Sequence, residues 1–139
     1  MRVVLDTNVL ISAAISGRGA CGEIWRAWRF GAFQLVTSPP ILAEYERVLR
    51  YPRIARRLAW TGEQVAEVLH LLSEQTTTVH PTQSLSVIMA DPTDDRFLEA
   101  AIAGEADCIV SRDEHLLSLG RFEGVEIVAP ARLLAILSV

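Results

Sequence analysis

The chain begins with Met1–Leu10, MRVVLDTNVL, which holds the clearest indication of its fold. Its apolar run Val3–Leu5 is short and rich in β-branched residues, which predicts a buried strand that ends before Asp6. A helical pattern over residues 8–15 follows almost at once. A strand that leads straight into a helix is typical of an open α/β sheet, in which ligands bind beyond the carboxyl ends of the strands. The polar triplet Asp6-Thr7-Asn8 therefore marks a candidate functional edge.

The same alternation of strands and helices continues along the chain. Further strands are predicted at residues 33–37, 76–79, 108–110 and 125–128, and helices at residues 20–30, 40–51, 63–74, 95–104 and 130–138. This order predicts an α/β fold, a three-layer α/β/α sandwich with a central, mainly parallel sheet of about five strands. No repeat, low-complexity tract or linker interrupts the sequence, so we expect one domain, residues 1–139.

Two further strand ends carry polar residues, at Thr37-Ser38-Pro39-Pro40 and at Ser111-Arg112-Asp113. In the first, Ser38 is expected to cap a helix that Pro39 opens. If the strands are parallel, all three polar junctions lie at the same edge of the sheet. Asp6 and Asp113 each have a second interpretation, as the N-cap of the following helix, and the pattern alone leaves both interpretations open.

A third acidic group, formed by Asp91, Asp94 and Asp95, lies at the start of the predicted helix 95–104. Asp91 has the features of an N-cap, because Pro92 follows it at the first helical position. Asp94 falls near the middle of the apolar stripe of this helix, where a carboxylate is costly unless something compensates its charge. We therefore prefer Asp94 to Asp95 as a metal ligand, with Asp91 as a further alternative.

The helix predicted at residues 40–51 carries Glu44 and Glu46, one on each side of its apolar stripe. Helical periodicity does not choose between them, and either one alone is usually a solvated surface residue. If one of them joined Asp6, Asp94 and Asp113, the site would hold only hard oxygen ligands. Such ligands favour Mg²⁺ or Mn²⁺ over zinc, and these ions support phosphodiester hydrolysis.

All 13 basic residues are arginine, and the sequence contains no lysine. This excludes P-loop chemistry and phosphoryl transfer through an aspartyl nucleophile of the kind that relies on a lysine. Charge is unevenly distributed: residues 1–60 hold nine Arg against four acids, and residues 61–139 hold four Arg against thirteen acids. The arginine-rich residues 1–60 could bind phosphates, and the acidic residues 61–139 could contribute to a cation site. Two solvated surfaces of opposite charge would give the same charge distribution.

The chain has no apolar run close to the roughly 20 residues that span a bilayer. Its two cysteines, Cys21 and Cys108, are too few and too far apart to suggest a disulfide framework or a zinc site. We therefore expect a cytoplasmic protein without a membrane segment.

Four segments resemble, in order, the motifs of PIN domains, and specifically of the PIN-family toxins related to VapC in bacterial toxin–antitoxin systems. The segments are MRVVLDTNVL at 1–10, TSPPILAE at 37–44, DPTDDRFLEAA at 91–101 and ADCIVSRD at 106–113 followed by Leu116-Leu117. The resemblance implies that Asp6, Glu44, Asp94 and Asp113 are the catalytic and metal-binding acids, with Glu44 rather than Glu46. It also implies supporting roles for Asn8 and for Ser111, which stands where threonine is commoner.

By this resemblance, the protein is expected to be an Mg²⁺- or Mn²⁺-dependent endoribonuclease acting on single-stranded or structured RNA. The expected partners are an RNA substrate, a protein antitoxin and a second copy in a homodimer. The alternative is a non-catalytic PIN-like module that binds RNA or protein.

An array of arginines follows Glu44 and is a candidate for RNA binding, because guanidinium groups pair well with phosphates. Its members are Arg50, Arg53, Arg56 and Arg57, with Arg47 before them and Tyr51 and Trp60 interspersed. A solvated helix face, with Trp60 packed inside, is the alternative interpretation.

Overall fold

The computed structural model describes residues 1–86 and 94–138. The described residues form a six-stranded sheet in the order β3-β2-β1-β4-β6-β5. Its strands are β1 (Arg2–Leu5), β2 (Gln34–Thr37), β3 (Thr77–Thr78), β4 (Cys108–Val110), β5 (Arg121–Phe122) and β6 (Val125–Val128). All neighbouring pairs are parallel except β5 with β6, which are antiparallel. The prediction of a mainly parallel α/β sheet is confirmed.

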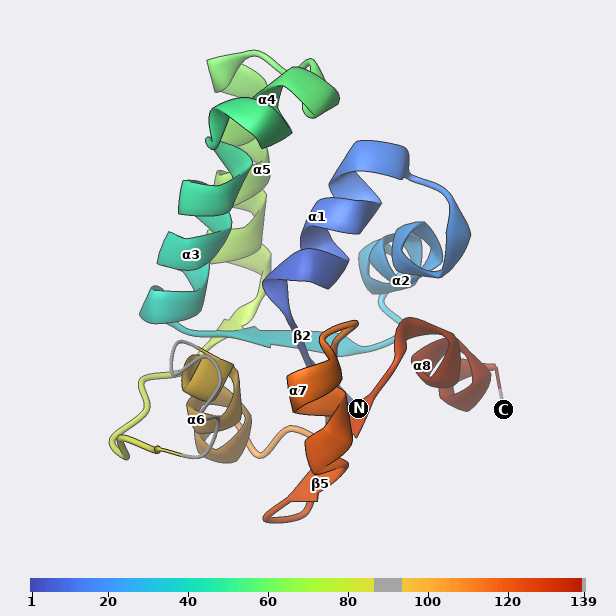
Figure 1. Ribbon diagram of the computed structural model, residues 1–139, viewed down its shortest axis with the longest axis vertical. Coiled ribbons are helices and arrows are strands. Elements are labelled where there is room, and N and C mark those ends of the chain that lie inside the picture. The colour runs from blue at the N-terminus through green and yellow to red at the C-terminus, as the bar shows by residue number, and fades with distance from the viewer. Residues whose placement is uncertain (87–93, 139) are drawn as a thin grey trace.

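Helices cover the sheet in two layers (Figure 1). They are α1 (Thr7–Ser16), α2 (Gly19–Arg29), α3 (Pro39–Leu49), α4 (Pro52–Leu58), α5 (Gly62–Gln75), α6 (Asp95–Ala103), α7 (Glu114–Leu119) and α8 (Pro130–Leu137). Helices α1, α2, α3 and α5 lie above β2 in Figure 1, with α1 packed on α2 and α3, and α8 contacts α2. Helices α6 and α7 lie on the other side, where α6 contacts β1, β2 and β4 and α7 contacts β6.

The central strands β1 and β4 are apolar except for Arg2 at the start of β1, as expected for strands that helices cover on both faces. Val3, Val4, Ile109 and Val110 have no measurable exposure, and Leu5 is 2% exposed. They pack in one core with residues of α2, α3, α6 and α8. A smaller apolar cluster of Ile11, Leu49, Leu58 and Val65 joins α4 to α1, α3 and α5. Within the described ranges, no helix is both long and apolar enough to cross a membrane.

Local capping explains where two of the helices begin. The Ser38 hydroxyl accepts a hydrogen bond from the Ile41 backbone N–H at 3.3 Å, and Pro39 stands at the first helical position, as the sequence predicts. Thr61 and Gln64 form a reciprocal capping box at the start of α5. Because Ser38 directly follows β2, its cap fixes the direction in which α3 leaves the sheet.

Three elements were not predicted. Helix α4 follows α3 after a break at Arg50-Tyr51, since Pro52 cannot continue α3 but is well suited to open a new helix. Helix α7 is six residues long and β5 only two, which is too short for a periodic pattern to be recognised. The expected N-cap at Asp91 lies outside the described residues.

Candidate active site

Three strands bring their carboxyl ends to one edge of the sheet. Strand β1 lies between β2 and β4 and is parallel to both. The first residue after β1, Asp6, donates its backbone N–H to the Val110 carbonyl at the end of β4, at 2.9 Å. The polar residues that follow β1, β2 and β4 therefore share this edge, as the sequence predicts.

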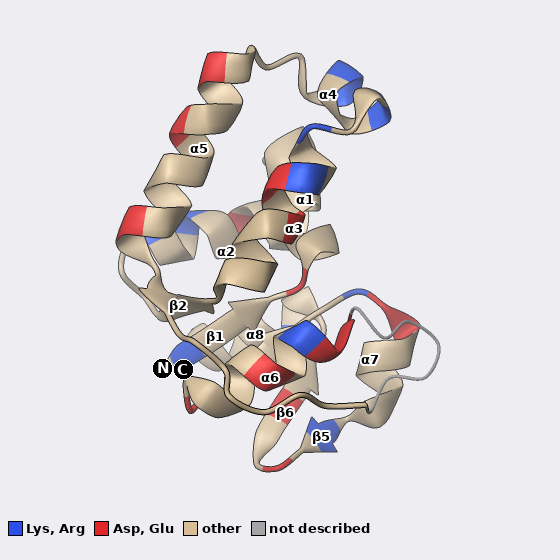
Figure 2. Cartoon of the chain, turned by 90° about the vertical axis from the view of Figure 1, so that its left-hand side faces the viewer, with Lys and Arg blue, Asp and Glu red and all other residues tan. Residues whose placement is uncertain are grey.

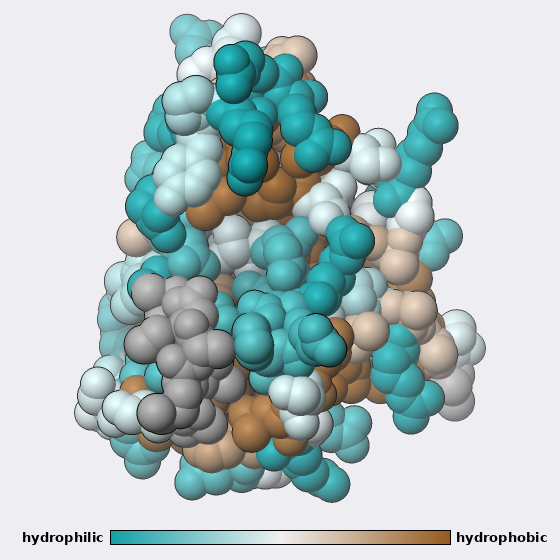
Figure 3. Space-filling model, viewed as in Figure 1, coloured by the Kyte–Doolittle hydropathy of each residue, from teal (hydrophilic) through white to brown (hydrophobic). Residues whose placement is uncertain are grey.

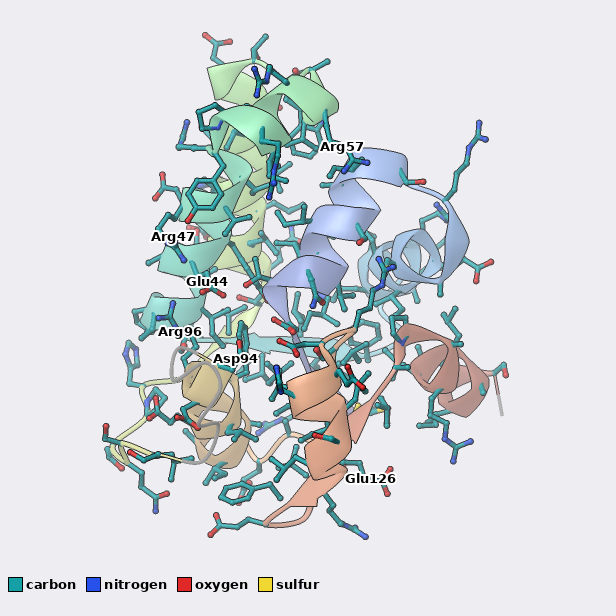
Figure 4. All side chains as sticks on the ribbon, in the orientation of Figure 1. Glu44, Arg47, Arg57, Asp94, Arg96 and Glu126 are labelled. Atoms are coloured by element: carbon teal, nitrogen blue, oxygen red, sulfur yellow. The ribbon has the colours of Figure 1, made fainter. Side chains whose placement is uncertain are left out.

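Four acidic side chains line one hollow of about 400 Å³ at this edge, which we call the acid hollow. They are Asp6 after β1, Glu44 in α3, Asp94 before α6 and Asp113 after β4. The structure thus brings together carboxylates that lie up to 107 positions apart in the chain. Figure 4 labels Glu44 and Asp94, whose side chains approach this hollow from α3 and from the start of α6.

Asp6 is 4% exposed and is held by Ser111. The Ser111 hydroxyl donates to Asp6 Oδ2 at 2.6 Å and accepts from the Asp113 backbone N–H at 2.9 Å. The pKa of Asp6 is raised to about 6, and burial is the largest cause. Hydrogen bonds from Ser111 and the Thr7 backbone lower this pKa, and the charges of Asp113 and Glu44 raise it. The carboxylates therefore repel one another across the hollow, which a cation would relieve.

Asp113 caps a helix and also lies in the acid hollow, so the two interpretations that the sequence leaves open do not exclude each other. Its side chain caps α7, because Oδ1 accepts a hydrogen bond from the His115 backbone N–H at 2.8 Å, and the same residue lines the acid hollow. Asp6 also occupies an N-cap position, that of α1, but makes no side-chain capping bond there. Asn8 lines the hollow too, and its Oδ1 accepts from the Arg112 backbone N–H at 3.4 Å.

Glu44 is 9% exposed and is surrounded by donors. Its Oε1 pairs with Arg47 at 3.4 Å and with Arg96 at 3.3 Å, and its Oε2 accepts a hydrogen bond from the Thr7 hydroxyl. Figure 4 shows Glu44 between the two arginines. By contrast, Glu46 is exposed and pairs with Arg50 at 3.3 Å on the outer face of α3.

Asp94 and Asp95 are both buried, at 7% and 4% exposure. Asp94 lines the acid hollow, whereas Asp95 is not among the described residues that do so. This placement agrees with the preference for Asp94. The third alternative, Asp91, lies outside the described residues.

The members of the predicted arginine array differ in their distance from the acids: only one of them lines the acid hollow. Of its members, only Arg57 lines the acid hollow, whereas Arg53 and Arg56 are exposed elsewhere on α4 and Arg50 is paired with Glu46. Figure 2 shows the basic residues of α4 gathered at one end of the molecule. Trp60 packs in the smaller apolar cluster, which agrees with the alternative interpretation of this residue.

One wall of the acid hollow is apolar. It is made by side chains from α1, α3 and α4, namely Ile11, Ile15, Val48 and Ile54. In Figure 3, a patch of hydrophobic residues is exposed just below the hydrophilic residues at the top of the molecule. The hollow therefore combines charged groups with a surface that suits an uncharged ring.

Sequence reasoning missed two residues that contact the acids. Thr7 belongs to the first polar triplet, where nothing links it to Glu44, and Arg96 lies in the third acidic segment. Its position beside Asp95 gives no local signal, because its partner Glu44 is 52 residues away in the chain.

Comparisons with known proteins agree with this geometry. A family model described as PIN domain matches residues 2–115. An uncharacterized protein of Methanocaldococcus jannaschii is 29% identical over 119 residues, which cover 86% of this chain and 75% of that protein. A chain from the crystal structure of VapBC2 from Rickettsia felis, bound to a DNA fragment from its promoter, has a similar fold, with a TM-score of 0.59 at 15% identity. That similarity covers 93% of this chain and 98% of the other. Because the family model spans most of its length, the chain belongs to the PIN domain family.

Proposed function

We propose that this protein is a metal-dependent endoribonuclease that hydrolyses phosphodiester bonds of single-stranded or structured RNA. The observation that carries the proposal is the acid hollow, where Asp6, Glu44, Asp94 and Asp113 meet from four segments of the chain. PIN domains are typically nucleases, and four converging carboxylates provide the charge that such chemistry requires.

The donor set fits Mg²⁺ or Mn²⁺, because every candidate ligand is a hard oxygen. Among the described residues, no three His, Cys, Asp or Glu side chains stand close enough to hold one ion together. This spacing is compatible with Mg²⁺, which keeps several waters and takes only one or two carboxylates directly. When bound, such an ion supplies positive charge to the phosphoryl group and the leaving oxygen.

The other residues of the hollow would orient the acids and the substrate. Ser111 fixes Asp6 relative to the backbone of Asp113. Arg47 and Arg96 pair with Glu44 and so fix its carboxylate in place. They also add positive charge beside the acid hollow, where it would attract the phosphate groups of an RNA strand. The apolar wall gives a nucleobase or sugar a surface to pack against.

A cleavage assay with matched glutamate variants tests this proposal. Glu44→Gln and Asp6→Asn are expected to lower the rate of Mn²⁺-dependent RNA cleavage by at least about 100-fold, because each removes a candidate metal ligand. Glu46→Gln is the control, since Glu46 is an exposed residue on the same helix. If Glu44→Gln and Glu46→Gln cleave equally well, the assignment of the site is wrong.

We further propose that the protein is the toxin of a toxin–antitoxin pair, works in the cytoplasm and forms a homodimer. The support for the antitoxin partner is the similarity of its fold to a chain of the VapBC2 complex. The compartment and the homodimer are proposed from the resemblance of the sequence to PIN-family toxins. Co-purification with the product of an adjacent reading frame that encodes a small DNA-binding protein would test the antitoxin partner.

One observation favours a second candidate function, a non-catalytic PIN-like module that binds RNA or protein. Glu44 already has two arginines and one hydroxyl as partners, which a metal ion would have to replace or share. The two functions differ in the same assay, because such a module leaves bound RNA intact at every Mn²⁺ concentration.

A further inference from the structure

A second and larger hollow, of about 780 Å³, opens beside the acid hollow. It lies between the second half of α1, the start of α2, α4, the loop after β4 and the start of α8. Ser12, Ile15 and Arg57 line both hollows, so the two are continuous. Figure 4 shows Arg57 on α4, next to the far end of α1.

Three arginines, Arg18, Arg57 and Arg112, line this second hollow, which we call the arginine groove. All three are exposed, and no acidic residue is among the described residues that line it. Across residues 1–86 and 94–138, the ion pairs involve Arg47, Arg50 and Arg96, and none involves these three.

One of the three guanidinium groups is held in place. Arg112 Nη1 donates to the Ser12 hydroxyl at 2.7 Å, which directs the side chain across the boundary between the two hollows. Because no acidic side chain is among the described residues that line the groove, an anion bound there would meet guanidinium groups and no carboxylate of the groove itself. The arrangement is therefore suited to a ligand that carries several negative charges in a row.

We propose that the arginine groove binds the sugar–phosphate backbone of the RNA strand whose scissile phosphate lies in the acid hollow. The inference rests on the proposed nuclease function. A strand that enters the acid hollow must continue past it, and the adjoining groove presents guanidinium groups that pair with phosphates. Arg57, at the junction, contacts the backbone next to the scissile phosphate, and Arg18 and Arg112 contact it farther along.

The assignment replaces most of the array predicted from the sequence. Arg50, Arg53 and Arg56 line neither hollow, whereas Arg18 and Arg112 come from loops that are distant in the chain. Binding by the groove is independent of base sequence, because guanidinium–phosphate pairs position a strand without reading its bases.

The test measures the Kd of a fluorescein-labelled, single-stranded RNA of about 20 nucleotides at several salt concentrations. EDTA is present, so that no metal-dependent cleavage occurs. The variant Arg18→Gln/Arg57→Gln/Arg112→Gln is compared with wild type. Its control is Arg29→Gln/Arg121→Gln/Arg132→Gln, which removes the same charge from three exposed arginines outside both hollows.

The groove variant is expected to bind with a Kd raised about tenfold or more near 0.1 M salt. The slope of log Kd against log salt should fall by about 2, since each lost phosphate contact contributes about 0.7 for single strands. The control variant should keep the slope of wild type. Equal loss in both variants, or a wild type that binds an acidic polypeptide but no RNA, overturns the proposal.

The outcome is separable from that of the nuclease proposal. If wild type loses RNA affinity on removal of the three arginines but cleaves no RNA with Mn²⁺, the groove stands and the nuclease assignment fails. If wild type cleaves RNA and the groove variant binds and cleaves as wild type does, the groove alone is wrong. Circular dichroism verifies that both variants are folded.

Discussion

At the scale of single residues, Asp6 shows how the site conflicts with stability. Its carboxylate is 4% exposed, and burial together with the charges of Asp113 and Glu44 raises its pKa to about 6. The unfolded chain binds the proton less tightly, with a pKa near 3.8. Ionised Asp6 therefore destabilises the metal-free fold at neutral pH, and its contribution to stability is fully present only below pH 3.8.

Asp6→Asn should consequently stabilise the metal-free protein above pH 6. The asparagine keeps the shape of the side chain and an oxygen that accepts from Ser111, but carries no charge. We expect the variant to exceed wild type by about 1–3 kcal/mol at pH 8 in EDTA, a difference that disappears as the pH falls below about 4. Urea unfolding at several pH values measures it, and a variant less stable than wild type at pH 8 would contradict the argument.

The two glutamates of α3 show what the sequence can and cannot predict about a single site residue. The helical pattern places Glu44 and Glu46 on either side of one apolar stripe, and only the resemblance to PIN domains favoured Glu44. In the structure the two differ sharply, since Glu44 lines the acid hollow and Glu46 faces outward with Arg50. Helix α6, in the other layer, contributes Arg96 to Glu44 at 3.3 Å, a contact that no pattern along α3 could predict.

At the scale of elements, α1 and α2 approach so closely that only glycine fits between them. Gly17 ends α1 with a φ of +64°, a conformation that glycine adopts without strain, and its N–H donates to the Ala13 carbonyl. A Cβ on Gly22 of α2 would lie 2.5 Å from the Gly17 backbone carbonyl. This contact sets the position of Arg18, which joins the two helices.

Two glycine-to-alanine variants test this packing. Gly22→Ala is expected to lower the free energy of unfolding by about 1–3 kcal/mol, because backbone must move to admit the methyl group. Gly62→Ala is the matched control at the start of α5, where nothing lies within 4 Å of the added Cβ. That control should be neutral or stabilising by about 0.4–1 kcal/mol. Equal urea midpoints for the two variants would rule out the close approach.

The sequence pattern does not predict helix α4, because the helix is short. Its seven residues begin with a proline and include three arginines, so the helix has too few apolar positions to show a periodic pattern. It is held by burial of Leu58 and by the packing of Ile54 against residues of α1, α3 and α5. Tertiary contact, rather than local preference, decides where its arginines lie.

At the scale of the whole molecule, a cation in the acid hollow should stabilise the fold, because it binds the folded protein and not the separated acids. At 100 times its Kd, Mn²⁺ is expected to raise the free energy of unfolding by about 2.7 kcal/mol, with a corresponding rise in Tm of several degrees. Thermal unfolding with and without Mn²⁺ measures this effect.

The control for this measurement is Asp107→Asn, which removes an exposed carboxylate remote from the hollow and should leave the Mn²⁺ effect unchanged. Asp6→Asn should abolish it. A Mn²⁺ effect of equal size in both variants would indicate binding elsewhere on the protein.

Patterns along the chain are enough to predict the alternation of strands and helices, the parallel sheet and the edge at which Asp6 and Asp113 lie. These features follow from local apolar runs and from the rule that parallel strands end on the same side. The resemblance to PIN domains names the four carboxylates together, but the arginines that join them in the two hollows become known only from the fold. Glu44 meets Arg96, and Arg18 joins Arg57 and Arg112, because packing of helices on the two faces of the sheet brings together residues that no local pattern connects.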